Sequence, residues 1–146
     1  MKLELKILGK SDAPMLALLE KECFSCPWSE EGCIDGLNSD RFYFVGLFDG
    51  EELIGYGSLT TVLDEGDVAR IAVRQDKRGK GYGGMILCDL ENEAKRRGVV
   101  HLHLEVRESN APARHLYEKV GFLTDGIRKN YYAKPLENAV LMTKKL

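Results

Sequence analysis

The sequence predicts an α/β fold in which antiparallel strands come first and a strand–helix–strand crossover follows. Three observations carry this prediction. Residues 3–7 alternate apolar and charged side chains, which is the pattern of a half-buried strand. Two apolar runs flank an Asp-Gly pair within residues 42–62, and this favours a hairpin. A helical pattern lies between apolar runs at 67–73 and 99–106, which predicts the crossover.

The first seventy residues predict two helices and a hairpin after the opening strand. Ser11 or Asp12 can cap the first helix, which has Pro14 in its first turn. Ser29, followed by two glutamates, predicts the start of the second helix. The stretch FYFVGLFDGEELIGYGSLTTV then predicts two antiparallel strands that turn at Asp-Gly.

The crossover begins with the strand DVARIAV, residues 67–73, and continues through GGMILCDLENEAKRRG. In the second stretch Met85, Ile86, Leu90 and Ala94 fall at helical spacing and predict an apolar helix face. Basic residues in the last turn and a glycine after them predict where this helix ends.

The last third predicts a strand, a short helix and two closing strands. VVHLHLEV is strand-like, and SNAPARHLYEKVGF predicts a helix capped by Ser109 or Asn110 that ends at Gly121. We expect two closing strands, at about residues 123–132 and 139–144, to finish the chain.

Composition is that of a folded, soluble domain. The 146 residues are 44% apolar and 30% charged, with a net charge of −2. Proteins that bind nucleic acid directly usually carry a strong basic excess, so no such partner is expected. No run approaches the ~20 apolar residues of a membrane span, and the charged first thirty residues lack the apolar core of a signal peptide. We therefore expect a cytoplasmic protein with no membrane partner.

Residues 77–84, KRGKGYGG, combine four glycines with three cations just before a predicted helix. Glycine has no Cβ, so a ligand can closely approach the backbone N–H groups. The helix start directs its positive end to the same place, which favours an anion. The stretch therefore predicts a phosphate-binding turn, and a merely flexible turn is the plainer alternative.

The same glycines also match a different nucleotide motif. Gly79-x-Gly81-x-x-Gly84 fits the dinucleotide fingerprint, and Glu105 follows about twenty residues later. In that fold, however, the glycines directly follow the first strand. Here the five polar residues 74–78 intervene, and hairpin strands come first. A P-loop is excluded because no Gly-Lys-Ser/Thr sequence ends the run.

The cysteines favour packing over metal binding. Cys23-x-x-Cys26 has the spacing of a zinc or redox pair. No second close Cys/His pair follows, because the histidines stand far away at 101, 103 and 115. A redox pair would also normally follow a strand and open a helix, whereas this pair follows a predicted helix. We expect no metal, and we expect the cysteines to pack as small apolar residues.

Two stretches together resemble a known family. Arg78-x-x-Gly81-x-Gly83, between a strand ending in RIAV and an amphipathic helix, is similar to the acetyl-CoA signature of the GCN5-related N-acetyltransferases (GNAT). LEVRESNAPARHLYEKVGF resembles a second block of that family. The resemblance implies that residues 1–146 form a single N-acetyltransferase domain with the GNAT fold. That fold is a mixed, mostly antiparallel central sheet flanked by helices, with a strand–helix–strand core that binds acetyl-CoA.

The resemblance also implies which residues bind the co-substrate, acetyl-CoA. In the family the glycine loop holds the pyrophosphate through its backbone, and the strand before it pairs with the pantetheine arm. Carried over to this sequence, coenzyme binding falls on Ile71, Ala72, Val73, Arg78, Gly79, Lys80, Gly81, Tyr82, Gly83, Gly84 and Asn110.

The family match assigns the chemistry to two further residues. Glu105 matches the base that takes a proton from the acceptor amine, directly or through a water. Tyr117 matches the acid that gives its proton to the departing thiolate. Each has a plainer alternative. Glu105 could be a surface residue at a strand end, and Tyr117 could be a buried aromatic on the helical face of Ala113 and Val120.

Three stretches, CPWSEE, EVRESN…LYEKVGF and IRKNYYAKPLENAVLM, resemble the RimI-type branch of the family. That branch acetylates the N-terminal alanine of a small-subunit ribosomal protein, so the resemblance implies the N-terminus of such a protein as partner. It makes Trp28, Tyr131 and Tyr132 candidates to line a peptide slot, with core packing as the alternative.

Two other functions stay open. Three cysteines crowd the segment around Pro27-Trp28, so the acceptor could instead be a small amine such as an aminoglycoside, a polyamine or an amino acid. The third possibility is a module that binds coenzyme A without turnover.

Overall fold

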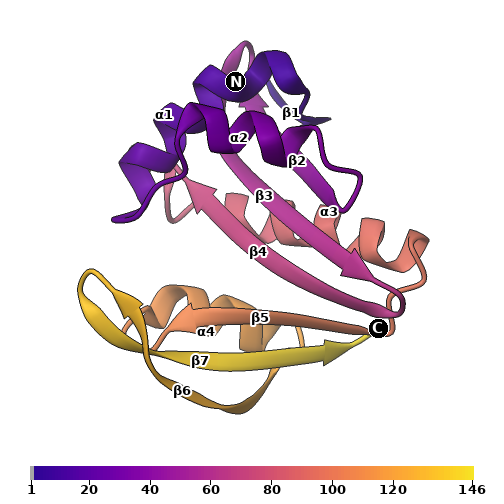
Figure 1. Cartoon of the computed structure of the whole chain (residues 1–146), viewed down its shortest axis with the longest axis vertical. Helices are drawn as coiled ribbons and strands as arrows, with labels where there is room; N and C mark the ends of the chain where they lie inside the picture. Colours follow the sequence, from indigo (N-terminus) through magenta and orange to yellow (C-terminus); the bar gives the residue numbers. More distant parts are fainter. Residues whose placement is uncertain (1) are drawn as a thin grey trace.

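One seven-stranded sheet organises the chain. In the computed structural model, which describes residues 2–146, the strand order is β1-β2-β3-β4-β5-β7-β6 (Figure 1). Strands β4 and β5 pair in parallel across helix α3, and the other neighbours pair antiparallel. The predicted mixed, mostly antiparallel sheet with a strand–helix–strand core is therefore confirmed. The elements are β1 (Leu3–Ile7), α1 (Ala13–Cys23), α2 (Glu30–Leu37), β2 (Phe42–Asp49), β3 (Glu52–Val62), β4 (Glu65–Val73), α3 (Tyr82–Arg96), β5 (His101–Arg107), α4 (Ala111–Lys119), β6 (Leu123–Ala133) and β7 (Leu136–Lys145), with 3₁₀ turns at Lys10–Asp12 and Gln75–Lys77.

The predicted helix starts are confirmed. Asp12 is the N-cap of α1. The hydroxyl of Ser29 accepts the Gly32 N–H at 3.0 Å at the start of α2. The side chain of Asn110, and not that of Ser109, caps α4. The side chains of Ser29 and Asn110 each give a partner to a backbone N–H that the helix itself cannot satisfy, whereas the Asp12 side chain makes no such bond to α1.

Some strands are longer than the sequence pattern predicts. Strand β4 begins at Glu65, because Glu65 pairs with Val62 across the turn from β3. Strand β7 begins at Leu136, which pairs with Ala133 of β6. Both additions are hairpin ends, where backbone pairing continues past the apolar run that marks a strand in sequence.

The sheet is covered on both faces, with a separate core on each. Helices α1 and α2 lie on one face, and α3 and α4 lie on the other (Figure 1). Strand β2 is buried on both sides, so Phe44 and Phe48 join the core under α1, while Val45 and Leu47 join the core under α3. None of the helices in residues 2–146 is both long and apolar enough to span a membrane.

Two glycines of β3 let α3 lie close to the sheet. A Cβ on Gly57 would lie 2.5 Å from Ile86 Cγ2 and 2.9 Å from Leu90 Cδ1, and both of these α3 side chains are fully buried. A Cβ on Gly55 would lie 3.0 Å from Ile86. The depth at which α3 sits, and hence the position of its first turn, depends on these missing side chains.

Gly57→Ala should therefore destabilise the fold by about 1–3 kcal/mol, the usual cost of overpacking a filled core. The matched control is Gly126→Ala on β6, where a new Cβ meets nothing within 4 Å. Urea denaturation of both variants measures the difference. Equal free energies of unfolding for the two variants would contradict this account of the packing.

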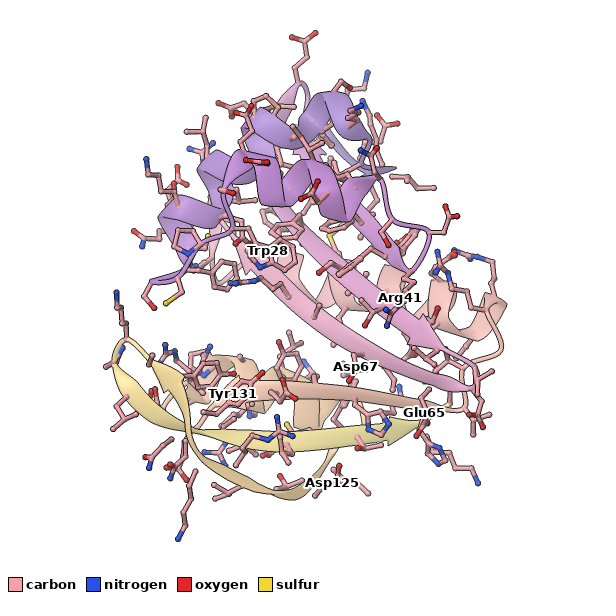
Figure 2. All side chains as sticks on the ribbon, viewed as in Figure 1. Trp28, Arg41, Glu65, Asp67, Asp125 and Tyr131 are labelled. Atoms are coloured by element: carbon pink, nitrogen blue, oxygen red, sulfur yellow. The ribbon has the colours of Figure 1, made fainter. Side chains whose placement is uncertain are left out.

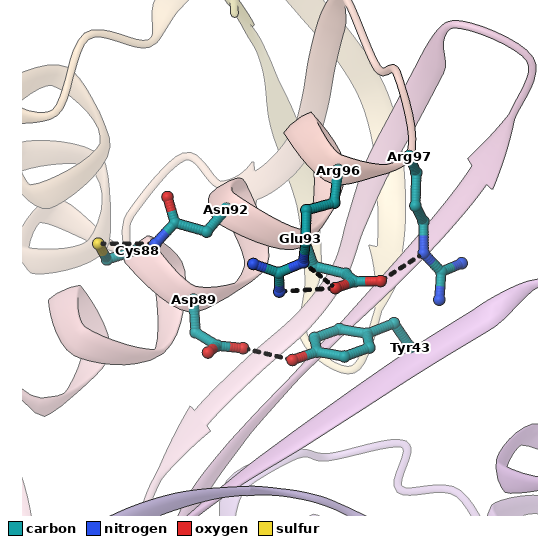
Figure 3. Close-up of polar contacts among 7 residues, drawn as sticks. All are labelled: Tyr43, Cys88, Asp89, Asn92, Glu93, Arg96 and Arg97. Carbon is teal, nitrogen blue, oxygen red and sulfur yellow. Dashed lines mark hydrogen bonds and ion pairs between the residues drawn. The ribbon is translucent and has the colours of Figure 1, made fainter.

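Polar side chains of α3 contact Tyr43 of β2 (Figure 3). The Tyr43 hydroxyl donates to Asp89 at 2.7 Å. Glu93 accepts from Arg96 and Arg97, each at 2.9 Å, and the Arg97 guanidinium lies 5.7 Å from the centre of the Tyr43 ring.

One residue of the predicted apolar face of α3 is misassigned. Met85 is 38% exposed, whereas Ile86, Leu90 and Ala94 are buried. Met85 follows Gly84 in the first turn of the helix, and it lies on the same side of the helix as Cys88, three residues later, which is also exposed.

Strands β4 and β5 separate soon after they meet. Their parallel register comprises Glu65 with His101, Gly66 with Leu102 and Asp67 with His103. Beyond these pairs the two strands diverge (Figure 1). A bulge at Ala69, the extra residue between the pairs that β3 makes with Val68 and Arg70, bends β4 at the point of divergence.

Candidate active site

The glycine-rich turn lies at the end of β4 and leads directly into α3. Gly79 and Gly81 have φ angles of +77° and +84°, in the left-handed region that suits glycine. A Cβ on either residue would meet nothing within 4 Å, so the space beside this backbone is open. Gly81 is the N-cap of α3.

The backbone N–H groups of this turn are available to a ligand. The first backbone hydrogen bond of α3 runs from the Met85 N–H to the Gly81 carbonyl at 3.2 Å. Within residues 2–146 the N–H groups of Gly79, Gly83 and Gly84 have no backbone acceptor. With the helix dipole behind them, such groups form an anion site.

Arg78 ties the turn to the strand before it. Its Nε donates to the Val73 carbonyl at 2.9 Å. On the other side of the turn, a Cβ placed on Gly83 or Gly84 would lie at ordinary contact distance from the Leu116 side chain of α4. The turn is thus held between the end of β4 and α4.

Glu105 lies on β5 beyond the last residues that pair with β4. Its side chain is exposed, and two residues of β6 hold it. The Tyr131 hydroxyl donates to Glu105 at 3.2 Å, and the Arg128 guanidinium lies 3.9 Å from the carboxylate. The predicted base and one predicted slot residue are therefore in direct contact.

Tyr117 is buried in α4 and packs edge-on against Phe122. Burial raises the pKa of Tyr117 to about 12, and the nearby Tyr132 hydroxyl contributes to the increase. Burial also raises the pKa of Tyr132 to about 12, with the charge of Glu105 as the next cause. The Tyr132 ring packs edge-on against Tyr131, with 5.0 Å between the ring centroids, and the Arg107 guanidinium lies 4.4 Å from its centroid.

Trp28 and Tyr131 lie on opposite sides of the diverging strands, and Asp67 and Glu65 lie further toward the end where β4 and β5 pair (Figure 2). Trp28 packs edge-on against Phe42 and Phe44, at centroid distances of 6.4 and 6.1 Å. Trp28 is half-buried, so part of its ring packs in the core and part remains accessible to solvent.

Comparison with known proteins fits this geometry. A sequence profile of the Acetyltransferase (GNAT) family matches residues 13–122. The chain belongs to the GNAT acetyltransferase family.

Two relatives of this GNAT protein and one solved structure carry closely related names. A [ribosomal protein bS18]-alanine N-acetyltransferase of Haemophilus influenzae is 41% identical over 90% of each chain. The protein of that name from Salmonella typhimurium is 38% identical over 94% of each chain. The crystal structure of the ribosomal-protein-S18-alanine N-acetyltransferase from Escherichia coli matches with a TM-score of 0.90 at 33% identity, covering 99% of this chain and 94% of that chain.

The remaining predicted positions of the GNAT site fall around the same turn. Ile71, Ala72 and Val73 form the end of β4, where the strand has left β5. Tyr82 is buried and Lys80 is exposed. The side chain of Asn110 accepts the Ala113 N–H at 3.2 Å, so its capping role is confirmed, and its contact with coenzyme stays a prediction.

The expected apolar packing of the cysteines is wrong for two of the four, because Cys26 and Cys88 are exposed. Cys23 donates to the Val73 carbonyl at 3.5 Å, and Cys33 is buried. His101 and His103 each lie 3.3 Å from Glu65. Across the described residues, 2–146, no group of three or more His, Cys, Asp or Glu side chains could hold a metal ion.

Sequence reasoning missed four residues of this region: Arg128 and Asp67 beside Glu105, and Glu20 with Arg70 beside Trp28. For Arg128 no simple signal exists, because alternation along a regular strand would place 128 and 131 on opposite faces. An irregularity in β6 between Arg128 and Tyr132 brings both side chains to Glu105.

Asp67→Asn should stabilise the protein at neutral pH. Partial loss of water raises the pKa of Asp67, His103 opposes the rise, and Glu105 and Glu65 add to it. A raised carboxyl pKa means that folding disfavours the charged form, so the charged carboxylate destabilises the protein above the pKa of the folded state. This destabilisation vanishes below the pKa of the unfolded state, ~3.9.

Because Asp67 is exposed, the expected increase in Tm at pH 7 is small, about 1–3 °C. Thermal unfolding at pH 7 and pH 3 tests the sign, with no increase expected at pH 3. A lower Tm at pH 7, or the same change at both pH values, would contradict the assignment.

Proposed function

We propose that this protein transfers the acetyl group of acetyl-CoA to the amine of an N-terminal alanine on a small-subunit ribosomal protein of the bS18 type. The observation that carries the proposal is the shared name of relatives 41% and 38% identical over at least nine-tenths of the chain. The reaction would take place in the cytoplasm, with neither a membrane nor a nucleic acid as partner.

The coenzyme would lie along the free side of β4 and end at the glycine turn. The open backbone of Gly79 and Gly81 leaves room for a pyrophosphate, and the free N–H groups at the start of α3 would donate to it. Beyond Asp67 the backbone of β4 no longer pairs with β5. The pantetheine amides would pair with Ile71, Ala72 and Val73 there, and the N–H of Ile71 would polarise the acetyl carbonyl.

Glu105 would act as the base. An N-terminal α-amine has a pKa of about 7.7–8.0, so much of it is protonated at neutral pH and a carboxylate needs to remove one proton. The Tyr131 hydroxyl and the Arg128 guanidinium keep the carboxylate in place. The freed nitrogen lone pair then attacks the thioester carbonyl, and the C–S bond breaks as the amide forms.

Tyr117 would protonate the departing thiolate. Burial keeps the phenol in its neutral form at physiological pH, with a pKa of about 12. A thiol has a pKa of about 8.5, so transfer of the phenolic proton alone would run uphill. Transfer coupled to breakdown of the tetrahedral intermediate avoids this cost, because the second proton of the amine nitrogen would pass to the phenolate oxygen as the thiol forms, which regenerates the phenol. The proton held by Glu105 would pass to water.

The aromatic residues would line the acceptor side. Trp28 stands on one side of the diverging strands and Tyr131 on the other (Figure 2), and the Tyr132 ring packs edge-on against Tyr131. A polypeptide N-terminus entering between the first two would bring its amine to Glu105.

Intact-mass analysis tests the proposal. Small-subunit ribosomal proteins from an unacetylated source would be incubated with the protein and acetyl-CoA, and one acetyl group should appear on the terminal alanine of one protein. A peptide whose N-terminus is already blocked should be inert. Turnover of small amines in place of any ribosomal protein would move the acceptor assignment to those amines, and acetyl-CoA binding without turnover on either would indicate a binding module.

A further inference from the structure

A buried carboxylate holds the segment between α1 and α2. Glu20 of α1 is 0% exposed. Its Oε1 accepts the backbone N–H of Trp28 at 2.8 Å, and its Oε2 accepts the Tyr56 hydroxyl. A buried charge persists only where it is paired and hydrogen-bonded. Glu20 therefore fixes the C-terminal end of residues 24–29, which we term the acceptor loop.

The positive charge that pairs with Glu20 comes from β4, in the middle of the sheet. Arg70 Nε lies 3.7 Å from Glu20 Oε2, and its Nη2 donates to the Cys26 carbonyl at 3.2 Å. The guanidinium carbon lies 4.2 Å from the ring centroid of Phe24 and 4.9 Å from that of Trp28. One side chain thus contacts the acceptor loop at three residues.

Arg70 also lies next to the proposed coenzyme strand, and its side chain keeps 21% exposure. Burial and the charge of Glu105 raise the pKa of the Tyr131 hydroxyl, and the positive charges of Arg128 and Arg70 oppose the rise. Arg70 directly precedes Ile71, the first residue of the proposed coenzyme strand.

We propose that Arg70 is a positioning residue for the acetyl acceptor. It holds the acceptor loop against β4, so that Trp28 forms one wall of the acceptor slot opposite Tyr131. This inference rests on the proposed function. Arginine suits the position because its planar guanidinium can stack on aromatic rings while it donates hydrogen bonds in a fixed plane, and lysine carries the charge without that geometry.

The test is Arg70→Lys, which keeps a positive charge beside Glu20 and loses the stacking and the bond to Cys26. With an alanine-terminated peptide, KM should rise about 10-fold or more while kcat stays within about threefold, the signature of lost acceptor binding. The Kd for acetyl-CoA should stay within about twofold, because the coenzyme contacts are untouched, and this also reports that the variant is folded.

A second readout does not depend on the acceptor. Trp28 is the one tryptophan of the chain, so intrinsic fluorescence reports on the acceptor loop alone. Acrylamide quenching of Trp28 should increase in Arg70→Lys, because the guanidinium no longer covers the ring.

The matched control is Arg97→Lys. Arg97 also pairs with a carboxylate, Glu93, at 2.9 Å and lies near an aromatic ring, that of Tyr43, but it is the C-cap residue of α3, and these contacts lie outside the acceptor loop. It should change neither KM nor quenching. If Arg70→Lys lowers Tm as the control does and leaves KM and quenching unchanged, Arg70 is only structural and the proposal is wrong. If the wild-type protein does not acetylate the peptide, the proposed function fails, and the quenching comparison still decides whether Arg70 holds the loop.

Discussion

Glu105→Gln is expected to lower kcat/KM for acetylation of an alanine-terminated peptide by about 100- to 1,000-fold, within the usual range for loss of a general base. Glutamine has nearly the same shape and can still accept the Tyr131 hydroxyl, which lies 3.2 Å from the carboxylate, so the surroundings should keep their geometry. The Kd for acetyl-CoA should not change. Steady-state kinetics and a coenzyme titration measure the two effects separately.

The loss of kcat/KM in Glu105→Gln should become smaller at high pH. Above the amine pKa of about 7.7–8.0 the acceptor is already deprotonated, so less depends on the base. Glu93→Gln is the control, because Glu93 binds Arg96 and Arg97 on α3 and should leave kcat/KM unchanged. Full activity of Glu105→Gln would remove Glu105 from the base role and leave it as a surface residue.

Tyr117→Phe is expected to lower kcat by about 10- to 100-fold. The loss is smaller than for the base, because a thiolate whose conjugate acid has a pKa of about 8.5 can leave without full protonation. The Tyr117 hydroxyl makes no hydrogen bond to any of residues 2–146, so its removal should hardly change Tm. Single-turnover kinetics with a preloaded coenzyme complex would measure the chemical step.

Tyr43→Phe serves as the control, because it should lower stability and leave kcat unchanged. The Tyr43 hydroxyl donates to Asp89 at 2.7 Å on the far side of α3, so its loss should cost about 1–3 kcal/mol of stability and leave kcat unchanged. Wild-type kcat in Tyr117→Phe would reduce Tyr117 to a packing role. The pKa of about 12 for Tyr117 further predicts that activity between pH 7 and 10 shows no decline from ionisation of this residue.

The parts of the site that could be predicted from the sequence are those whose residues lie close together along the chain. The glycine turn, its cations and the helix start lie within a few residues of one another, and the structure has them as one turn at the end of β4. The caps at Ser29 and Asn110 are local in the same way. Local hydrogen bonds and φ angles depend on near neighbours, so a sequence pattern is enough to predict them.

The parts that sequence reasoning missed depend on contacts between distant segments. Glu20 and Arg70 are fifty residues apart, and each alone looks like an ordinary surface charge. Their pairing exists because α1 packs on β3 and β4 and buries the carboxylate completely. Arg128 reaches Glu105 through an irregularity of β6, and the period-2 pattern of a strand contains no sign of such an irregularity.

The early separation of β4 from β5 has a consequence for solubility. Between Val68 and Val73 one side of β4 is a free strand edge in the middle of the sheet, and a free edge is a template on which a strand of another molecule can pair. Most proteins protect such edges with charges or a bulge, and here a bulge stands at Ala69. A coenzyme lying along this edge would block it more fully, so bound co-substrate would also protect the enzyme against self-association.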